Sequence, residues 1–537
     1  MGGYAFIDVS QKQTFIFKHN GLKKNLYNSF VIKALTEKMK ELEDNQDDFS
    51  LSWFLTGNYS NRHEFVYSGG GNSIVRFYNA EDLVPFVREY SREALVRFPD
   101  IELYISCVTD EEVEGILKEE EQSNAYKVIH RELHSRADQL KDKRRARFRR
   151  WSYGVEEIDE TGYPAIAQAK QDKKNDDQKY NRARNHLFGP LEEQLANSKI
   201  ETTNELQNFK KDSESEGKSY IGVIALDGNK MGDLVSKVRT YDELRLFSEA
   251  IDQLYQDAVV NALKTTLISS DEWEDKKVPV TPVVMAGDDV CLIVPAEHAI
   301  ETAATIIKNI QHQSEAFIES GNLPHIFEDE PYLTACAGVV ITKVTYPFFE
   351  AVQKAEALCK QAKEALYAVG EPGQAATASF IDWEIVQGQV IPESAYARHV
   401  KHNNDREVFR IRPLRIDQEA GIDRGIFSYD AVKGLADNMY DISNSQLEKV
   451  KQLAYEGKHA YRFFFDQRGA EDKLACMTKE HLPGSKFDQD GDQPGWDPSN
   501  APIWVSKRDG RTTYTYVLND AIELRAFTTQ KGEEADD

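Results

Sequence analysis

The chain has 537 residues, enough for three or four domains of ordinary size with large buried cores. Acidic residues number 90 and basic residues 66, so the net charge is −24. This acidic excess argues against a protein coated with nucleic-acid-binding surface, and it confines any such site to a local basic island.

The cysteines and the apolar runs exclude further classes of protein. Five cysteines are scattered without a CxxC pair, which argues against a zinc ribbon or a disulfide framework. No apolar run reaches the roughly 20 residues of a membrane span, and the first residues lack a signal-peptide pattern. We expect a cytoplasmic protein that neither spans a membrane nor binds zinc.

Residues 1–117 predict a first domain. Tyr4 to Val9 reads as a strand with Asp8 near its end, and His63 to Tyr78 reads as two strands around a glycine-rich tip. Three glycines let the backbone approach a ligand closely, which favours a nucleotide cradle, although a plain hairpin turn stays open. The tip consists of Ser68, Gly69, Gly70, Gly71 and Asn72.

Residues 118–218 are rich in Lys, Glu, Gln and Asn and predict a mostly helical insert. Lys141 to Arg150 carries seven basic residues, with Phe148 and Trp151 beside them. Such an island can contact RNA by charge and stacking. A solvated helix face explains the same run and is slightly favoured.

Residues 219–386 predict a second domain with chemistry at two strand ends. Ser219 to Leu226 is a nearly continuous apolar run, as expected for a strand buried on both faces, and Asp227 follows it. A glycine-rich turn after such a strand, here with Gly228 and Asn229, can hold a phosphate and its metal.

The hairpin tip after that strand carries two adjacent carboxylates. Val278 to Pro295 reads as two β-branched strands joined by Ala286, Gly287, Asp288 and Asp289. Adjacent like charges need compensation, and a divalent cation with oxygen ligands supplies it. A solvated turn remains the alternative for the tip alone. The β-α-β-β order makes the tip a neighbour of Asp227, so the three acids are expected to converge on one or two Mg²⁺ or Mn²⁺ ions.

The rest of the chain carries weaker signals. Pro347 to Val369 reads as a helix whose Lys363 can reach a triphosphate, although exposed lysine is the commoner case. Residues 387–537 predict a mostly helical C-terminal domain with an acidic tail at Glu533 to Asp537. We expect a structural or partner-docking role for this domain.

Four motifs together resemble the large, palm-bearing subunit of type III CRISPR effector complexes (Csm and Cmr). Asp8 to Leu35 is similar to that family's first-palm opening, and Leu226 to Gly232 to the turn of its second palm. Ala286 to Asp289 resembles the family's Gly-Gly-Asp-Asp signature, with Ala instead of the first Gly. Cys336 to Lys363 is similar to the family's last palm strand and helix. The resemblance implies an α+β fold with two ferredoxin-like palms, a GGDEF-like signature and a helical insert between the palms.

The resemblance also implies an enzymatic activity. It implies a Mg-dependent nucleotidyltransferase that joins ATP into cyclic oligoadenylates for antiviral defence. Asp227, Asp288 and Asp289 would bind the metals, with nucleotide contacts from Gly228, Asn229, Gly287 and Lys363. The degenerate first palm would hold the acceptor ATP at Ser68 to Asn72. Guide or target RNA and other effector subunits are implied partners.

Departures from the family leave alternatives open. The sequence has no His-Asp dipeptide, so the nuclease domain that often precedes these palms is not expected, and DNA cleavage is not predicted. Zinc-binding cysteines between the palms are missing as well. The alternatives are another palm cyclase or polymerase outside CRISPR, and a silent scaffold that binds RNA or nucleotide.

Overall fold

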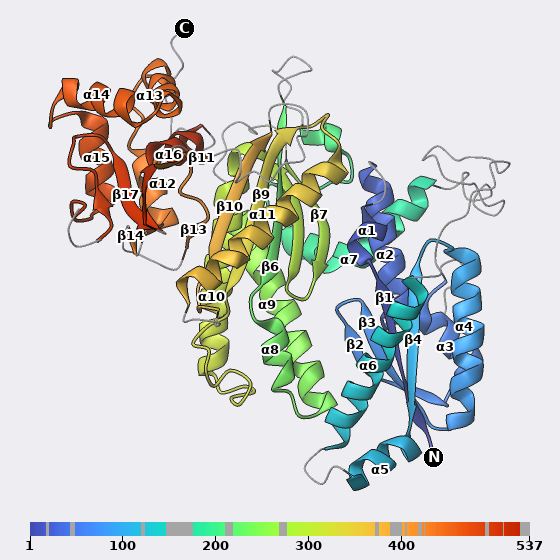
Figure 1. The fold of residues 1–537 in the computed structure, drawn as a ribbon. Helices are drawn as coiled ribbons and strands as arrows, with labels where there is room; N and C mark the ends of the chain where they lie inside the picture. The colour runs from blue at the N-terminus through green and yellow to red at the C-terminus, as the bar shows by residue number, and fades with distance from the viewer. Residues whose placement is uncertain are drawn as a thin grey trace.

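The computed structural model places three bodies in a row, with the first palm and the C-terminal domain at opposite ends and the second palm between them (Figure 1). No helix of the described residues has the length and apolar character of a membrane span. The structure describes residues 1–17, 21–42, 49–119, 124–145, 176–209, 219–267, 277–370, 375–386, 400–402, 405–416, 422–423, 425–488, 493–508 and 510–526.

The first palm is built on a four-stranded antiparallel sheet in the order β2-β3-β1-β4. Its strands are β1 (Gly3–Ser10), β2 (His63–Gly69), β3 (Asn72–Phe77) and β4 (Glu102–Thr109). The helices between them are α1 (Lys12–Ile16), α2 (Leu22–Thr36), α3 (Leu51–Tyr59) and α4 (Leu83–Arg97). The predicted first strand and the two strands around the glycine-rich tip are confirmed, and α3 was not predicted.

The central strand β1 is buried on both faces, and its side chains alternate between two cores. Ala5, Ile7 and Val9 pack toward α2, α3 and α4, whereas Phe6 faces a second cluster. That second cluster is completed by α6 (Ala125–Arg145), which follows α5 (Asp110–Glu119). The first helix of the insert is therefore one layer of the first palm.

The rest of the described insert bridges the two palms. Helix α7 (Asp176–Leu195) packs on α2, and β5 (Ile200–Thr202) pairs in parallel with the second palm's edge strand. The helical character predicted for the insert is confirmed for α6 and α7, whereas Ile200–Thr202 is a strand. The basic run beyond Arg145, with Phe148 and Trp151, lies outside the described residues.

The second palm follows the predicted order of strands and helices. Its elements are β6 (Tyr220–Gly228), α8 (Met231–Ser236), α9 (Tyr241–Leu267), β7 (Val278–Ala286), β8 (Asp289–Pro295), α10 (Ala299–Glu319), β9 (Ala335–Lys343), α11 (Phe348–Val369) and β10 (Phe380–Val386). They form a seven-stranded sheet in the order β13-β10-β9-β6-β8-β7-β5, where β13 is Leu414–Arg415.

Strand β6 lies in the middle of this sheet and is covered on both faces, as its apolar run predicts. Ile224 and Leu226 pack into the core with α9 and α10, and Val223 into the core with α11. The second of these cores also contains the helices of the first palm. Phe17 of the first palm meets Phe348 of the second with ring centroids 6.1 Å apart. The two palms are thus packed against each other.

The C-terminal domain combines the predicted helices with a five-stranded sheet. Its helices are α12 (Tyr429–Asp437), α13 (Asn444–Glu456), α14 (Lys458–Arg468), α15 (Lys473–His481) and α16 (Leu518–Arg525). The sheet order is β11-β12-β18-β17-β16, formed by Val400–His402, Arg406–Val408, Arg511–Tyr516, Ile503–Arg508 and Gly495–Trp496. A small hairpin, β14 (Ile422–Asp423) and β15 (Ile426–Phe427), precedes α12. The predicted acidic tail lies outside the described residues.

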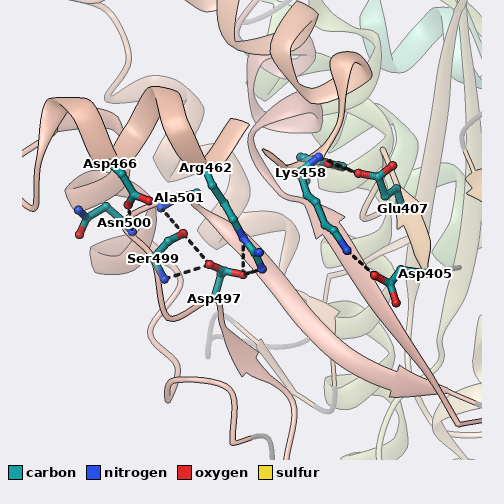
Figure 2. Close-up of polar contacts among 10 residues, drawn as sticks. Asp405, Glu407, Lys458, Arg462, Asp466, Asp497, Ser499, Asn500 and Ala501 are labelled. Carbon is teal, nitrogen blue, oxygen red and sulfur yellow. Dashed lines mark hydrogen bonds and ion pairs between the residues drawn. The ribbon is translucent and has the colours of Figure 1, made fainter. Parts of the chain in front are cut away.

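Ion pairs hold this domain together and tie it to the second palm. Figure 2 shows Arg462 reaching from α14 to Asp497, whose side chain is 1% exposed. Arg412 is buried beside Asp520 at 2.7 Å, and it also lies 3.8 Å from Asp382 of β10. Arg412 therefore connects the C-terminal domain to the second palm's sheet.

Candidate functional site

The three predicted acids meet at one corner of the second palm. Asp227 at the end of β6 lies directly opposite Asp289, the first residue of β8. Asp288 precedes it in the tight turn after Ala286, where Gly287 has a φ of +62° that favours glycine. The structure brings the strand end and the hairpin tip together, as the β-α-β-β order predicts.

Gly228 is required by a close approach between the two strands. A Cβ atom at this position would lie 2.8 Å from the Cβ of Asp288 and 2.6 Å from the hydroxyl of Tyr255. The amide of Gly228 also donates to the carbonyl of Asp288 at 3.3 Å. Its lack of a side chain lets the tip close onto β6.

Lys363 of α11 supplies the positive charge at this corner. Its Nζ lies 2.7 Å from Oδ2 of Asp227 and donates to the carbonyl of Gly228 at 2.8 Å. Burial lowers the pKa of Lys363, but the nearby Asp227 outweighs this effect and the pKa is raised. Of the other lysines on α11, Lys354 pairs with Glu384 and Lys360 is exposed.

One lysine does not neutralise the acids. Burial raises the pKa of Asp288 to about 6, with the charge of Asp227 as the second cause. Burial and the charges of Asp227 and Asp288 raise the pKa of Asp289 to about 7. Carboxylates that gain protons for want of a counter-charge favour the binding of a cation.

Two further residues at this corner were not predicted. Glu356 lies two turns before Lys363 on α11, and burial raises the pKa of its carboxyl to about 7. Tyr255 of α9 is buried, and its hydroxyl has no hydrogen-bond partner within the described part of the chain. The seven-residue spacing from Lys363 was a signal for Glu356, because residues two turns apart share a helix face.

Asn229 is not part of the open corner. Its side chain is 3% exposed and donates to Thr334 at 3.0 Å and to the carbonyl of Ala378 at 3.1 Å. These bonds fasten the turn after β6 to β9 and to the segment before β10. The structure thus gives Asn229 a role in supporting the site.

The tip of the first palm repeats the geometry of the second. Asp8 on β1 lies opposite Asn72 on β3, as Asp227 lies opposite Asp289. Gly70 and Gly71 form the turn with φ values of +61° and +74°, and a Cβ at Gly70 would meet nothing within 4 Å. These registers make Gly71 and Asn72 the counterparts of Asp288 and Asp289.

In the first palm, two lysines neutralise the strand-end acid. Lys12 Nζ lies 3.2 Å from Asp8 and donates to the carbonyl of Gly70 at 3.0 Å. Lys141 of α6 approaches the other oxygen of Asp8 at 3.0 Å. The described start of the basic run therefore has a structural contact inside the first palm.

The remaining residues of the first tip make internal contacts. The hydroxyl of Ser68 accepts from the amide of Lys38 at 2.7 Å and from the hydroxyl of Ser73 at 3.0 Å. A Cβ at Gly69 would lie 2.9 Å from the hydroxyl of Ser248 on α9. The first tip therefore lies against a helix of the second palm.

The donor set at the acidic corner fits a hard divalent cation, although the side chains do not yet converge on one point. Among the residues described, no group of three or more His, Cys, Asp and Glu side chains is arranged to hold a metal ion. Asp227 is turned toward Lys363, whose ammonium group contacts one carboxylate and one carbonyl oxygen. Oxygen ligands of this kind suit Mg²⁺, so the residues fit the ion once Asp227 turns.

A hollow of about 230 Å³ lies in the C-terminal domain, away from the acids. It is lined by Arg462, Asp497, Ser499, Tyr514 and neighbouring apolar residues. Its two charged members pair with each other (Figure 2), so the hollow presents no unbalanced charge of its own.

Comparisons with known proteins bear on the second palm and on the fold. Residues 220–367 match the family model of the Cas10/Cmr2 second palm domain. No curated protein matches the sequence. Csm1 of T. onnurineus is similar in structure, with a TM-score of 0.50 and 13% identity over 90% of this chain and 67% of that one.

A second similar structure is the apo Csm1–Csm4 cassette, with a TM-score of 0.43 and 13% identity over 90% of this chain. The chain spans 64% of the length of that match. The family match covers the acidic corner and Lys363, and the Csm1 likeness covers the fold. Residues 220–367 of the chain therefore match the Cas10/Cmr2 second palm domain, and the chain as a whole has a fold like that of Csm1.

Proposed function

We propose that this protein is a nucleotidyltransferase that joins ATP into a cyclic oligoadenylate at the acidic corner of the second palm. The observation that carries the proposal is the cross-strand pairing of Asp227 with Asp289, beside Asp288. It combines surplus negative charge with a neighbouring lysine in a domain of the Cas10/Cmr2 family. Other palm proteins use such acids for metal-assisted phosphoryl transfer.

Each residue has a part in the proposed reaction. A ribose hydroxyl of one nucleotide forms a bond to the α-phosphorus of the next, the hydroxyl loses its proton, and pyrophosphate leaves. Asp227, Asp288 and Asp289 would hold Mg²⁺ or Mn²⁺, which lowers the pKa of the hydroxyl and stabilises the leaving charge. Lys363 would release Asp227 to the metal and bind the phosphate oxygens of the substrate.

The first palm is the proposed site of the acceptor nucleotide. Its tip has open space at Gly70 and keeps two lysine charges near Asp8. Asn72 stands where the second palm has the acid Asp289. Lys12 and Lys141 each form an ion pair with one carboxylate oxygen of Asp8. This palm would therefore bind nucleotide without catalysing transfer.

Assembly with RNA and with other effector subunits is part of the same proposal. It rests on the match of the second palm to the Cas10/Cmr2 family. The part of the basic run from 146 to 150 remains a candidate contact for RNA. A cytoplasmic location goes with this role.

The proposal is tested by incubating the full chain with Mg²⁺ and each of the four nucleoside triphosphates, with and without RNA. Mass spectrometry of the products should show cyclic adenylates from ATP. Pyrophosphate should be released in proportion to the phosphodiester bonds formed. Linear templated products or a guanine-only dimer would identify another palm enzyme. No turnover under any of these conditions would favour a silent scaffold and contradict the proposal.

A further inference from the structure

The hydroxyl of Tyr255 lies beside the acidic corner without a hydrogen-bond partner. Tyr255 of α9 is 1% exposed, and its hydroxyl meets neither solvent nor any hydrogen-bonding atom of the described residues. Burying such a group costs free energy, because the hydrogen bonds that it makes with water are lost. Buried polar groups in proteins are normally paired, so this hydroxyl makes Tyr255 a candidate for a role at the corner.

The backbone of Gly228 locates the hydroxyl relative to the acids. A Cβ at Gly228 would lie 2.6 Å from the hydroxyl of Tyr255 and 2.8 Å from the Cβ of Asp288. Its third close neighbour would be the Cε of Met231, also at 2.8 Å. Of the two side chains that share this space with the hydroxyl, only Asp288 ends in a strong acceptor, since a thioether sulfur accepts weakly. Tyrosine keeps its proton at neutral pH and can donate it to that acceptor.

Helix α9 also holds the backbone of the hairpin tip. Asp252 lies about one turn before Tyr255, so the two residues are neighbours along the helix. Asp252 accepts a hydrogen bond from the amide of Gly287 at 2.6 Å. With the backbone of the tip held in this way, rotation of the Asp288 side chain is the movement that can bring a carboxylate oxygen to the hydroxyl.

The first palm, which lacks the two adjacent acids, has no such unpaired hydroxyl at the corresponding position. Helices α2 and α9 each begin 14 residues after the strand-end acid of their palm (22 − 8 and 241 − 227). By this spacing Thr36 is the counterpart of Tyr255, since each lies 28 residues after that acid (36 − 8 and 255 − 227). The hydroxyl of Thr36 donates to the carbonyl of Ile32 in its own helix at 2.8 Å. The unpaired hydroxyl therefore occurs in the palm that carries the acids.

We propose that Tyr255 is a positioning residue for the metal site, whose hydroxyl donates a hydrogen bond to the carboxylate of Asp288 when that carboxylate binds a divalent cation. A carboxylate that binds a metal through one oxygen can accept a hydrogen bond with the other, and such outer partners orient the ligand. The same hydrogen bond gives the buried hydroxyl its partner. The inference rests on the proposed function for the cation at this corner, but it does not require that ATP is turned over.

Binding of Mn²⁺ to the nucleotide-free full chain tests this role without catalysis. Electron paramagnetic resonance measures free Mn²⁺ during a titration, and the binding that Asp288→Ala/Asp289→Ala abolishes is assigned to the corner. Tyr255→Phe removes only the hydroxyl and should weaken this binding about tenfold, which is the usual effect of losing an outer partner of a metal ligand.

Tyr461→Phe is the matched control. Tyr461 is fully buried in the C-terminal domain, and its hydroxyl likewise has no hydrogen-bond partner among the residues that the structure describes. Its replacement removes the same atom away from the acids and should leave the affinity for Mn²⁺ unchanged. An equal loss of affinity in both variants would contradict a specific role for Tyr255.

Urea unfolding separates a positioning role from a purely structural one. Without metal, Tyr255→Phe should be at least as stable as the wild type, because it removes an unpaired buried hydroxyl. With Mn²⁺ present, the wild type should gain the larger rise in unfolding midpoint, because tighter binding stabilises the native state more. A hydroxyl that only supports the fold predicts lower stability without metal and an equal gain with it. Failure of Tyr255→Phe to fold would therefore overturn the proposal.

The Mn²⁺ titration also distinguishes failure of this proposal from failure of the proposed function. Equal affinity in the wild type and Tyr255→Phe overturns the role of Tyr255 even if the wild type makes cyclic adenylate. Weaker binding in Tyr255→Phe supports the role even if no nucleotide is turned over, which would count against the proposed function alone. A wild type whose Mn²⁺ binding does not depend on Asp288 and Asp289 would overturn the role of Tyr255 together with the metal site.

In an active enzyme, the Mg²⁺ concentration that gives half the maximal rate should rise about tenfold in Tyr255→Phe. The kcat at saturating Mg²⁺ should stay within about twofold of the wild type, because excess metal compensates for weaker binding. A loss of kcat that excess Mg²⁺ does not restore would overturn the positioning role.

Discussion

Asp227 and Asp289 lie directly opposite each other on adjacent antiparallel strands, at the point where β6 ends and β8 begins. Two carboxylates in this position repel each other unless a cation lies between them or a proton neutralises one. Lys363 forms an ion pair with Asp227, and its charge only partly offsets the raised pKa values of Asp288 and Asp289. The remaining charge supports the proposal that this corner binds a divalent ion.

The surplus charge predicts how stability depends on pH in the metal-free protein. The pKa values of Asp288, Asp289 and Glu356 are raised to about 6, 7 and 7. The native state therefore holds protons that the unfolded chain has lost between about pH 4 and pH 7, so stability falls as pH rises through that window. The midpoint of urea unfolding should be lower at pH 8 than at pH 5.

Asp289→Asn is the matched variant for this effect. The amide has no charge to bury, so the variant should be more stable than the wild type at pH 8 by about 1–3 kcal/mol in the absence of metal. At pH 5 the difference should shrink. A midpoint that rises with pH to the same extent in both proteins would contradict this explanation.

Replacement of Lys363 should reduce activity. Lys363→Met removes the ammonium group from Asp227 and Gly228 and should lower kcat about tenfold or more, since charged donors near a reacting phosphate act on the transition state. Lys360→Met, an exposed change on the same helix, should leave kcat unaltered. Equal effects of the two changes would argue against a role for Lys363 in the site.

Gly228→Ala tests the close approach of the hairpin tip to β6. The added methyl group would lie 2.6 Å from the hydroxyl of Tyr255 and 2.8 Å from Asp288, so we expect a loss of about 1–3 kcal/mol in stability. Gly228→Ala with Tyr255→Phe should recover part of that loss. Gly232→Ala, where a Cβ meets nothing within 4 Å, is the control and should be neutral.

Arg412→Ala should weaken the C-terminal domain and its connection to the second palm. The side chain of Arg412 is 1% exposed and that of Asp520 is not exposed at all, so the change leaves a buried carboxylate unpaired. Breaking a buried pair in this way costs about 3–5 kcal/mol. Thermal unfolding of Arg412→Ala should begin at a lower temperature than that of Arg468→Ala. The latter change breaks an ion pair with Asp472 in which the arginine is more exposed.

Much of the second palm was predictable because its signals are local. Each of three features is recognisable within about 20 residues of sequence: the apolar run of β6, the Asp-bearing tip and the α11 helix. The C-terminal sheet was only partly predicted, because β12 pairs with β18 across about a hundred residues of chain and each strand is short. Long-range pairing of short strands leaves little periodicity to detect.

The site residues also divide into those that a local sequence pattern predicts and those whose role depends on the folded structure. Asp227, Asp288 and Asp289 follow from strand ends and turn chemistry. Asn229 shares their motif, but its amide faces inward to Thr334, and a motif does not show which way a side chain turns. The approach of the first tip, at Gly69, to Ser248 of α9 depends on how two separate domains pack, which no local pattern specifies.

The most direct test of the account compares wild type with Asp288→Ala/Asp289→Ala in ATP and Mg²⁺, measuring pyrophosphate and product mass on the same samples. Removing two carboxylates should lower pyrophosphate release about a hundredfold or more, while circular dichroism shows an intact fold. The wild type should yield cyclic adenylate with one pyrophosphate per bond. Equal turnover by both proteins would contradict the account, and so would a wild type that makes no phosphodiester product with any activating RNA.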